Sequence, residues 1–118
     1  MCGVAGFFTT QKNINLNLKS LEKMAEKLHH RGPDGRGFYE SQDGRVGLAH
    51  TRLAIIDLHT GEQPICDDSH KMTIVANGEF YNYKRIRGGL VAEGEKFKTK
   101  SDCEVDLKLY KKYGLDFV

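Results

Sequence analysis

The sequence predicts one domain that combines β-strands with α-helices. Its 118 residues, 39% of them hydrophobic, can bury one core but not two. Short apolar runs within Met1–Phe8, Val46–His50 and Met72–Ala76 are typical of strands. Leu18–Leu28 and Cys103–Tyr113 instead carry apolar residues at helical spacing. No internal repeat or low-complexity stretch divides the chain, so we expect a single mixed unit.

The charge balance and the cysteine count exclude several classes of protein. Eighteen basic and 16 acidic residues give a net charge of +2, which indicates a mixed surface and no nucleic-acid partner. Three cysteines do not make a disulfide framework, and we expect no secretory leader, so the expected compartment is the reducing cytoplasm. No apolar run approaches membrane-spanning length, so we expect no membrane partner.

The first strand, expected in Met1–Phe8, carries a cysteine directly after the methionine. Its apolar, glycine-spaced run is typical of a buried strand with close neighbours. Removal of Met1 would leave a thiol and a free α-amine on Cys2, and an amine of pKa ~7.7–8.0 can take the proton of a thiol of pKa ~8.5. Cys2 would then be a nucleophile with its own base. The alternative is a small buried cysteine without chemistry.

Residues that favour helix ends bound the first helix. Asn17 is placed to cap Leu18–Leu28, and Gly32-Pro33 ends the segment. We predict a tight turn over Arg31–Gly35, because proline fixes φ between two glycines.

Two apolar strands are expected next, Val46–His50 and Leu53–Ile56, with Arg52 between them. Leu53–Ile56 is apolar at every position, which predicts a strand that is covered on both faces. A guanidinium at the edge of such a strand needs an anion. Arg52 is therefore either a structural ion-pair partner or a bidentate clamp on a carboxylate.

The segment Gly61–Lys71 is predicted to be a loop. Within it, Cys66–His70 offers one cysteine and one histidine without a second pair, which is too little for a zinc site. We therefore expect no metal in this chain.

A buried strand over Met72–Ala76 is predicted to run into Asn77-Gly78. This dipeptide is a strong hairpin signal, so a plain turn is one interpretation, but no alternating return strand follows it. Asn82 is predicted to cap a helix that reaches about Ala92. Gly88-Gly89 interrupts that helix at ~1 kcal/mol per glycine relative to alanine, so we expect it to be short, broken or frayed.

The last predicted helix begins at a capping box, with Ser101 at the cap and Glu104 three residues later. Two neighbouring apolar stripes follow, and Gly114 ends the helix. One stripe comprises Cys103, Leu107 and Tyr110, and the other comprises Val105, Leu109 and Tyr113. Asp102 falls in the first turn, where the helix dipole favours a carboxylate whether or not it binds a ligand. A short strand-like stretch around Phe97 precedes the helix.

Six short motifs follow one another along most of the chain. They are Met1-Cys2-Gly3, Arg31–Asp34, Arg52–Asp57, Gln63-Pro64, Asn77–Asn82 and Ser101–Val105. Each motif alone is weak evidence, but the ordered set closely resembles the glutaminase domain of class II glutamine amidotransferases, in particular the asparagine synthetase branch.

The resemblance implies the α+β fold of the N-terminal-nucleophile hydrolases, a four-layer αββα sandwich of antiparallel sheets. Residues 1–118 would be the N-terminal part of a glutaminase domain that is truncated at its C-terminus. The resemblance assigns Cys2 as the nucleophile and its freed α-amine as the general base. The Asn77 side chain and the Gly78 backbone N–H would form the oxyanion hole.

Substrate-binding roles follow from the same resemblance. Arg52 would hold the α-carboxylate of L-glutamine, and Glu79 and Asp102 would receive its α-ammonium. Hydrolysis would give glutamate and ammonia, and a synthetase domain or subunit would use the ammonia to make asparagine. ATP and magnesium are expected only in that synthetase domain, and no cofactor is expected in this one.

Three functions stay open at this point. The first is glutamine hydrolysis that supplies ammonia to a synthetase. The second is an N-terminal-nucleophile amidase for a different amide, although such a substrate would not need the zwitterion clamp of Arg52 and Asp102. The third is a non-catalytic, truncated module for oligomerisation or regulation, because unpaired sheet edges invite association into a homo-oligomer.

Overall fold

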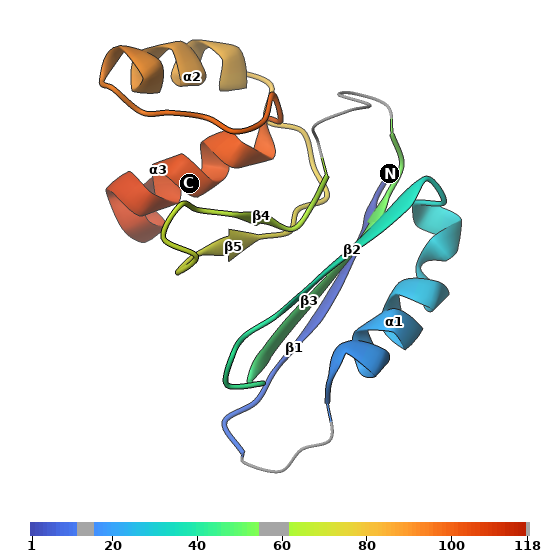
Figure 1. Cartoon of the computed structure of the whole chain (residues 1–118). Helices are drawn as coiled ribbons and strands as arrows, with labels where there is room; N and C mark the ends of the chain where they lie inside the picture. Colours follow the sequence, from blue (N-terminus) through green and yellow to red (C-terminus); the bar gives the residue numbers. More distant parts are fainter. Residues whose placement is uncertain (12–15, 55–61, 118) are drawn as a thin grey trace.

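The structure is a computed structural model that describes residues 1–11, 16–54 and 62–117 (Figure 1). Its elements are β1 (Gly3–Phe8), α1 (Leu18–Lys27), η1 (His29–Arg31), β2 (Gly35–Glu40), β3 (Val46–Arg52), β4 (Ile65–Cys66), β5 (Thr73–Ile74), α2 (Tyr83–Ala92), α3 (Cys103–Tyr113) and η2 (Gly114–Phe117). The strands form antiparallel sheets, which confirms the α+β class. The four-layer sandwich and the truncation stay predictions. Across the described ranges, no helix has the length and apolar character to cross a membrane.

Strands β1, β3 and β2, adjacent in that order, form a sheet that α1 covers on one face (Figure 1). Alternate strand residues and the apolar stripe of α1 meet in one core, formed by Leu21, Ala25 and Ala49 with Ala5, Phe7, Met24 and Phe38. Leu21 is completely buried, and burying a leucine side chain contributes ~1.5–3 kcal/mol. The stripe read from the sequence is therefore the packing face of α1.

The start of α1 confirms the predicted cap. The Asn17 side chain accepts from the Ser20 N–H at 3.3 Å, and the Ser20 hydroxyl accepts from the Asn17 N–H at 3.4 Å. These reciprocal bonds form a capping box at the start of α1.

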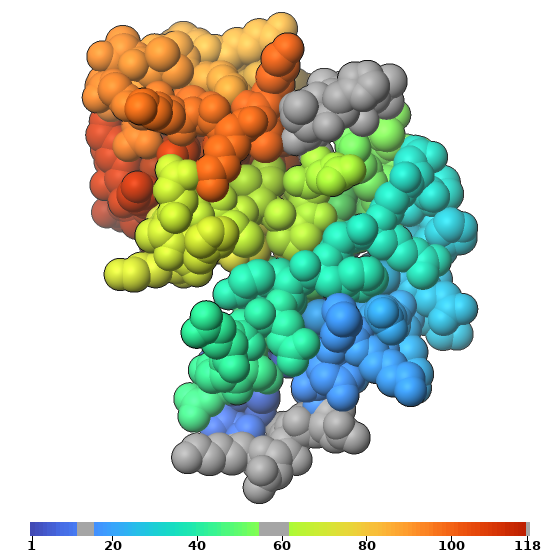
Figure 2. All heavy atoms as spheres, viewed as in Figure 1, coloured from blue at the N-terminus to red at the C-terminus, as the bar shows by residue number. Residues whose placement is uncertain are grey.

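The opposite face of the three-stranded sheet is only partly covered. Val4 is 43% exposed and Phe8 is 72% exposed, so β1 is a strand as predicted but is buried on one face alone. The loop before β4 covers Gly37 of β2: a Cβ there would lie 1.7 Å from the Gln63 carbonyl oxygen. In Figure 2, the segment that leads to β4 lies against the part of the surface that β2 forms.

Strands β4 and β5 form a short ribbon against α3. Ile65 of β4 packs with Cys103 and Leu107, whereas Val105 on the neighbouring stripe packs with Leu90 of α2. Helix α3 therefore lies between the ribbon and α2 (Figure 1). The two predicted stripes are confirmed in their first two turns. Their last members, two tyrosines, are about half exposed.

The strand predictions need several corrections. Strand β4 lies within Gly61–Lys71, which the sequence predicts to be a loop. Strand β2 was not predicted, because Gly35–Glu40 has little apolar periodicity and pairing with β3 holds it in place. Strand β3 continues through Arg52, and the described part of the predicted Leu53–Ile56 strand, Leu53 and Ala54, is irregular. Their N–H groups bond to the Cys2 sulfur and to the Asp34 carboxylate instead of to a strand. The predicted Met72–Ala76 strand shortens to Thr73–Ile74.

The helix predictions also need correction. Helix α2 continues unbroken through Gly88-Gly89, because packing at Leu90 offsets the low helix propensity of glycine. The region around Phe97 is not a strand. At α3 the N-cap is Asp102 and not the predicted Ser101. The Ser101 hydroxyl accepts from the Cys103 N–H, and Glu104 does not complete the predicted capping box. Its buried carboxylate accepts from the N–H groups of residues 98 and 99.

Candidate functional site

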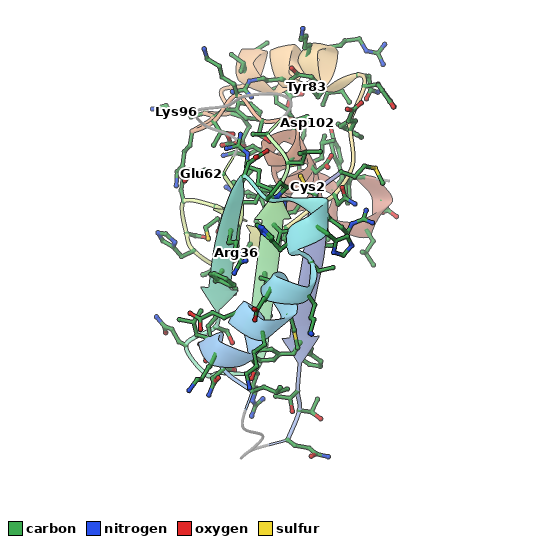
Figure 3. All side chains as sticks on the ribbon, turned by 90° about the vertical axis from the view of Figure 1, so that its right-hand side faces the viewer. Cys2, Arg36, Glu62, Tyr83, Lys96 and Asp102 are labelled. Carbon is green, nitrogen blue, oxygen red and sulfur yellow. The ribbon has the colours of Figure 1, made fainter. Side chains whose placement is uncertain are left out.

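Cys2 lies just before β1, at the end of the sheet that is nearer to α3 (Figure 3). Its sulfur accepts from the Leu53 N–H at 3.4 Å and lies 3.8 Å from the Leu53 carbonyl oxygen. The Arg31 side chain donates to the Cys2 carbonyl at 3.1 Å. Met1 is 73% exposed. The half-buried thiol is therefore held against the residue that follows Arg52, with the chain terminus toward solvent.

The Arg31–Asp34 turn fixes the end of β3. A Cβ on Gly32 would lie 2.4 Å from the backbone of Thr51, so only glycine permits this close approach. The Asp34 N–H donates to the Arg52 carbonyl at 2.9 Å, and the Asp34 carboxylate accepts from the Ala54 N–H at 2.8 Å. Hydrogen bonds to Asp34 thus hold the backbone at Arg52 and at Ala54, two residues later.

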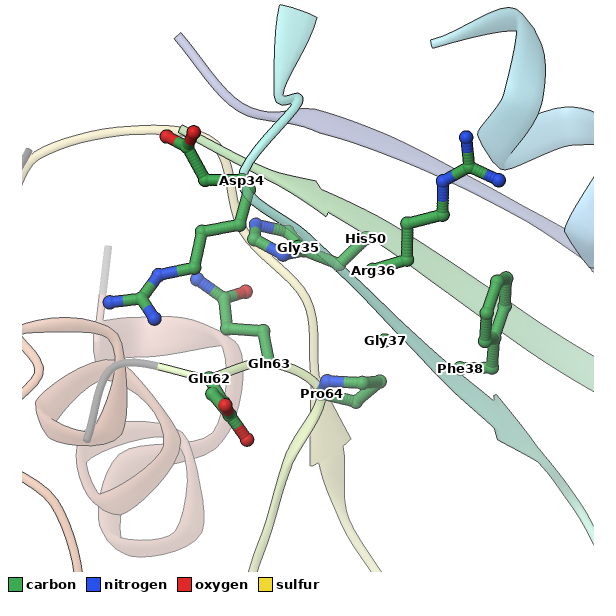
Figure 4. A pocket seen from close by; sticks show the side chains of 10 residues that line it. Asp34, Gly35, Arg36, Gly37, Phe38, His50, Glu62, Gln63 and Pro64 are labelled. Atoms are coloured by element: carbon green, nitrogen blue, oxygen red, sulfur yellow. The ribbon is translucent and has the colours of Figure 1, made fainter. Parts of the chain in front are cut away.

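Arg52 lines a cavity of about 310 Å³ between β2, β3 and the loop before β4 (Figure 4). Its lining is largely polar and comprises Asp34, Gly35, Arg36, Gly37, Phe38, His50, Arg52, Glu62, Gln63 and Pro64. This volume suits a small metabolite, because ligand sites begin at ~300 Å³.

His50 is a cavity residue that the sequence reasoning missed. It is 2% exposed, and its Nε2 has no hydrogen-bond partner among the described residues. Burial lowers the pKa of His50, the nearby Arg52 cation lowers it further, and a hydrogen bond with the Ala76 backbone partly offsets both. Strand alternation could have found it, because residues 50 and 52 share one face of β3.

Asp102 lies at the start of α3, beside the segment that the Asn-Gly motif occupies. Its Oδ2 accepts from the Phe80 N–H at 2.9 Å. Asn77, Gly78 and Glu79 directly precede Phe80 and are exposed, and a Cβ on Gly78 would meet no atom within 4 Å. The structure thus brings Asp102 close to the predicted oxyanion segment and leaves that segment open to a ligand.

The described contacts join the Cys2–Arg52 group to the Asn77–Asp102 group through Gln63. This residue lines the cavity with Arg52, and its side chain bonds to Ala76 and to Cys103. These contacts alone assign no chemical role to the six predicted site residues, and those roles stay predictions.

The Cys66–His70 segment has a structural role. The Asp67 carboxylate accepts from the Ser69 hydroxyl and from the N–H groups of Lys71 and Met72, and these bonds lower the pKa of Asp67 to about 2. The Asp67 carboxylate thereby stabilises the turn between β4 and β5. Within residues 1–11, 16–54 and 62–117, no three His, Cys, Asp or Glu side chains are grouped to hold a metal ion.

These features define an α+β domain in which Cys2 contacts Leu53, the residue after the cavity-lining Arg52. A family model described as "Glutamine amidotransferase domain" matches residues 1–118, so the chain belongs to that family. The resemblance read from the six motifs is therefore confirmed.

Relatives named as asparagine synthetases match along the whole chain. The chain is 40% identical to the "Probable asparagine synthetase [glutamine-hydrolyzing]" of Dictyostelium discoideum and 38% identical to "Asparagine synthetase [glutamine-hydrolyzing] 1" of Arabidopsis thaliana, and it covers 21% and 20% of them. It is also 41% identical to "Amidase chry2" of Gibberella zeae, of which it covers 19%. In each case 100% of this chain is matched. The chain spans about a fifth of the length of these curated relatives.

Proposed function

We propose that this chain hydrolyses glutamine to glutamate and ammonia, with Cys2 as the nucleophile. The observation that carries the proposal is the contact between the Cys2 sulfur and the backbone of Leu53 at 3.4 Å. This contact places the thiol one residue from Arg52, which lines the cavity. Family membership and the relatives' names support glutamine as the substrate.

Arg52 and Asp102 would orient the substrate by its two opposite charges. The Arg52 guanidinium offers two parallel N–H donors to the α-carboxylate, a geometry that lysine lacks. Asp102, with the neighbouring Glu79, offers negative charge to the α-ammonium. A substrate without an amino-acid end would gain from neither charge, which disfavours an amidase for other amides.

The base would be the α-amine of Cys2, freed when Met1 is removed. The amine takes the thiol proton, and the sulfur bonds to the side-chain carbonyl carbon of glutamine. The Asn77 side chain and the Gly78 N–H then donate to the developing oxyanion. The α-ammonium returns its proton to the amide nitrogen, so that ammonia leaves and a γ-glutamyl thioester remains.

Water completes the cycle. The same α-amine takes a proton from water as its oxygen bonds to the thioester carbonyl, and the C–S bond breaks to release glutamate. The sulfur recovers the proton. The chain's described cysteines, Cys2, Cys66 and Cys103, are all free thiols, which suits a reducing compartment such as the cytoplasm.

The ammonia would pass to an ATP-dependent synthetase domain or subunit. Asparagine synthesis is the product that the relatives' names favour. ATP and magnesium would belong to that partner, and the described residues here group no metal ligands. The glutaminase domain would continue beyond these strands into a four-layer sandwich that covers the open face at Val4 and Phe8.

The test separates molecules that retain Met1 from those that have lost it. Intact mass sorts the two pools, and glutamate release from glutamine is assayed on each. We expect turnover only without Met1, because the Cys2 nitrogen is otherwise an amide that accepts no proton. Equal turnover in both pools would overturn the self-activated cysteine. No turnover in either pool would favour the non-catalytic module.

A further inference from the structure

Gln63 bridges two segments that the proposed mechanism uses. Its Oε1 accepts from the Ala76 N–H at 2.6 Å, and its Nε2 donates to the Cys103 sulfur at 3.5 Å. The orientation of the side-chain amide is determined, because a backbone N–H can only donate and so must face the oxygen. Ala76 immediately precedes Asn77, and Cys103 immediately follows Asp102.

Cys103 extends the bridge to the carboxylate. Its thiol donates to Oδ1 of Asp102 at 3.7 Å, while Oδ2 accepts from the Phe80 N–H at 2.9 Å. Burial raises the pKa of Cys103 to about 11, and the adjacent Asp102 charge acts in the same direction. The sulfur therefore keeps its proton at neutral pH and stays a donor to Asp102.

Together these contacts hold the segment from Ala76 to Phe80 at both ends. Its first N–H bonds to Gln63 and its last to Asp102, and Cys103 links those two side chains. Between the ends, Asn77 and Gly78 are exposed. Hydrogen bonds at both ends orient the middle residues and leave their donors available.

We propose that Gln63 and Cys103 are positioning residues, which set the distance between the oxyanion donors of Asn77-Gly78 and the ammonium-binding carboxylate of Asp102. The inference rests on the proposed glutaminase function. Gln63 also lines the cavity with Arg52, so one side chain links all three substrate-contacting segments. A shift of about 1 Å at such a site can cost ~10²-fold in rate.

Hydrogen exchange tests the bridge without any assay of activity. In Gln63→Ala, we expect the Ala76 amide and also the Phe80 amide to exchange about tenfold faster, because the Asp102 carboxylate loses its support through Cys103. The Lys71 and Met72 amides, which bond to Asp67, serve as internal controls and should not change. Unchanged exchange at Phe80 would overturn the bridge. Equal acceleration at all four amides would mean that Gln63 only stabilises the fold.

Kinetics then test the consequence on molecules that have lost Met1. Cys103→Ala should raise KM for glutamine about tenfold, since it withdraws support from Asp102, whereas Gln63→Ala should lower kcat as well. The double variant should be no worse than the stronger single variant, because either change breaks the same link. Cys103→Ser keeps a donor and should restore most of the affinity.

The matched control is Cys66→Ala, which removes a half-buried thiol that bonds to Thr73 outside the bridge. It should leave both constants unchanged. Active sites can be counted by titration with a diazoketone analogue of glutamine. If a variant loses activity only because some molecules are unfolded, the titration gives fewer active sites while KM stays constant. Additive effects of Gln63→Ala and Cys103→Ala would overturn the inference. Absence of glutamate release by the unsubstituted protein would instead refute the proposed function, while the exchange experiment still decides on the bridge.

Discussion

The Asp102 carboxylate accepts a hydrogen bond from the Phe80 N–H at 2.9 Å. Through this bond, a side chain at the start of α3 fixes the position of the C-terminal end of the exposed segment Asn77–Glu79. The carboxylate that we propose for the substrate ammonium and the donors that we propose for the oxyanion are thus held in one arrangement, although they lie far apart in sequence. Substitution can test the two proposed roles separately, because a group that binds the ground state and a group that acts only on the transition state change different kinetic constants.

Asp102→Asn should weaken glutamine binding without unfolding the protein. The asparagine oxygen still accepts from Phe80, but the negative charge is lost, and a hydrogen bond to a charged group contributes ~1.5–3 kcal/mol. We expect kcat/KM for glutamine to fall about tenfold to a hundredfold, mostly through KM. Asp116→Asn, an exposed aspartate in η2, is the matched control. An unchanged KM would remove Asp102 from the substrate site.

Asn77→Ala should lower kcat and leave KM for glutamine nearly unchanged. An oxyanion donor acts on charge that exists only near the transition state, and its loss typically costs ~10²–10³ in rate. Asn82→Ala is the matched control, because the Asn82 side chain makes no capping hydrogen bond. Full turnover by Asn77→Ala would show that Asn77-Gly78 is a plain turn.

Sequence reasoning predicted correctly those elements that local residues determine, such as α1. Leu21 and Ala25 recur at helical spacing and face the sheet, and Asn17 caps α1 with a local bond. The prediction was wrong where residues distant in sequence determine the backbone conformation. Leu53 was predicted to be a strand residue from its apolar neighbours, but its N–H bonds to Cys2, 51 residues away.

The same limit applies to the site. Asp102 was recognised from a motif, and the structure shows why it lies near Asn77: the Phe80 N–H connects them. Gln63 was not assigned a role, because its importance depends on hydrogen bonds that no local pattern encodes. For His50, strand alternation indicates a face shared with Arg52, but it does not show that this face lines a cavity. Local periodicity indicates which face a residue occupies, but not which residue lies opposite.

Asp106→Asn should stabilise the protein at neutral pH. Burial, with a contribution from Asp102 one helical turn earlier, raises the pKa of Asp106 from 3.8 to about 6. The folded state then holds a proton more tightly than the unfolded state, so stability falls as pH rises from about 4 to about 6 and stays reduced above. Because the side chain is only half-buried, we expect a gain of about 1 kcal/mol in the free energy of unfolding at pH ~7.5.

Urea denaturation at a series of pH values measures this gain. At pH values below about 4, Asp106 is protonated in both states, and the variant should match the unsubstituted protein. Asp116→Asn should follow the unsubstituted protein at every pH. A variant of Asp106 that is less stable at neutral pH would mean that its charge has a stabilising partner.

His50→Gln should make the protein less sensitive to mild acid. Burial and the Arg52 cation lower the pKa of His50, so below pH ~6.5 the unfolded chain takes up a proton that the folded chain resists. The contribution of neutral His50 to stability is therefore fully present above this pH and is lost as pH falls. The glutamine side chain of the variant has a similar size and does not titrate, so the variant should not show this loss. A hydrogen bond with the Ala76 backbone raises the pKa of His50 in part and so limits the effect.

Since Asp106 gives the opposite slope, unfolding should be compared in the Asp106→Asn background. His29→Gln, at an exposed histidine of η1, is the control. Parallel stability curves for His50→Gln and its parent between pH ~5 and ~7 would show that the imidazole takes its proton as easily in the folded as in the unfolded protein.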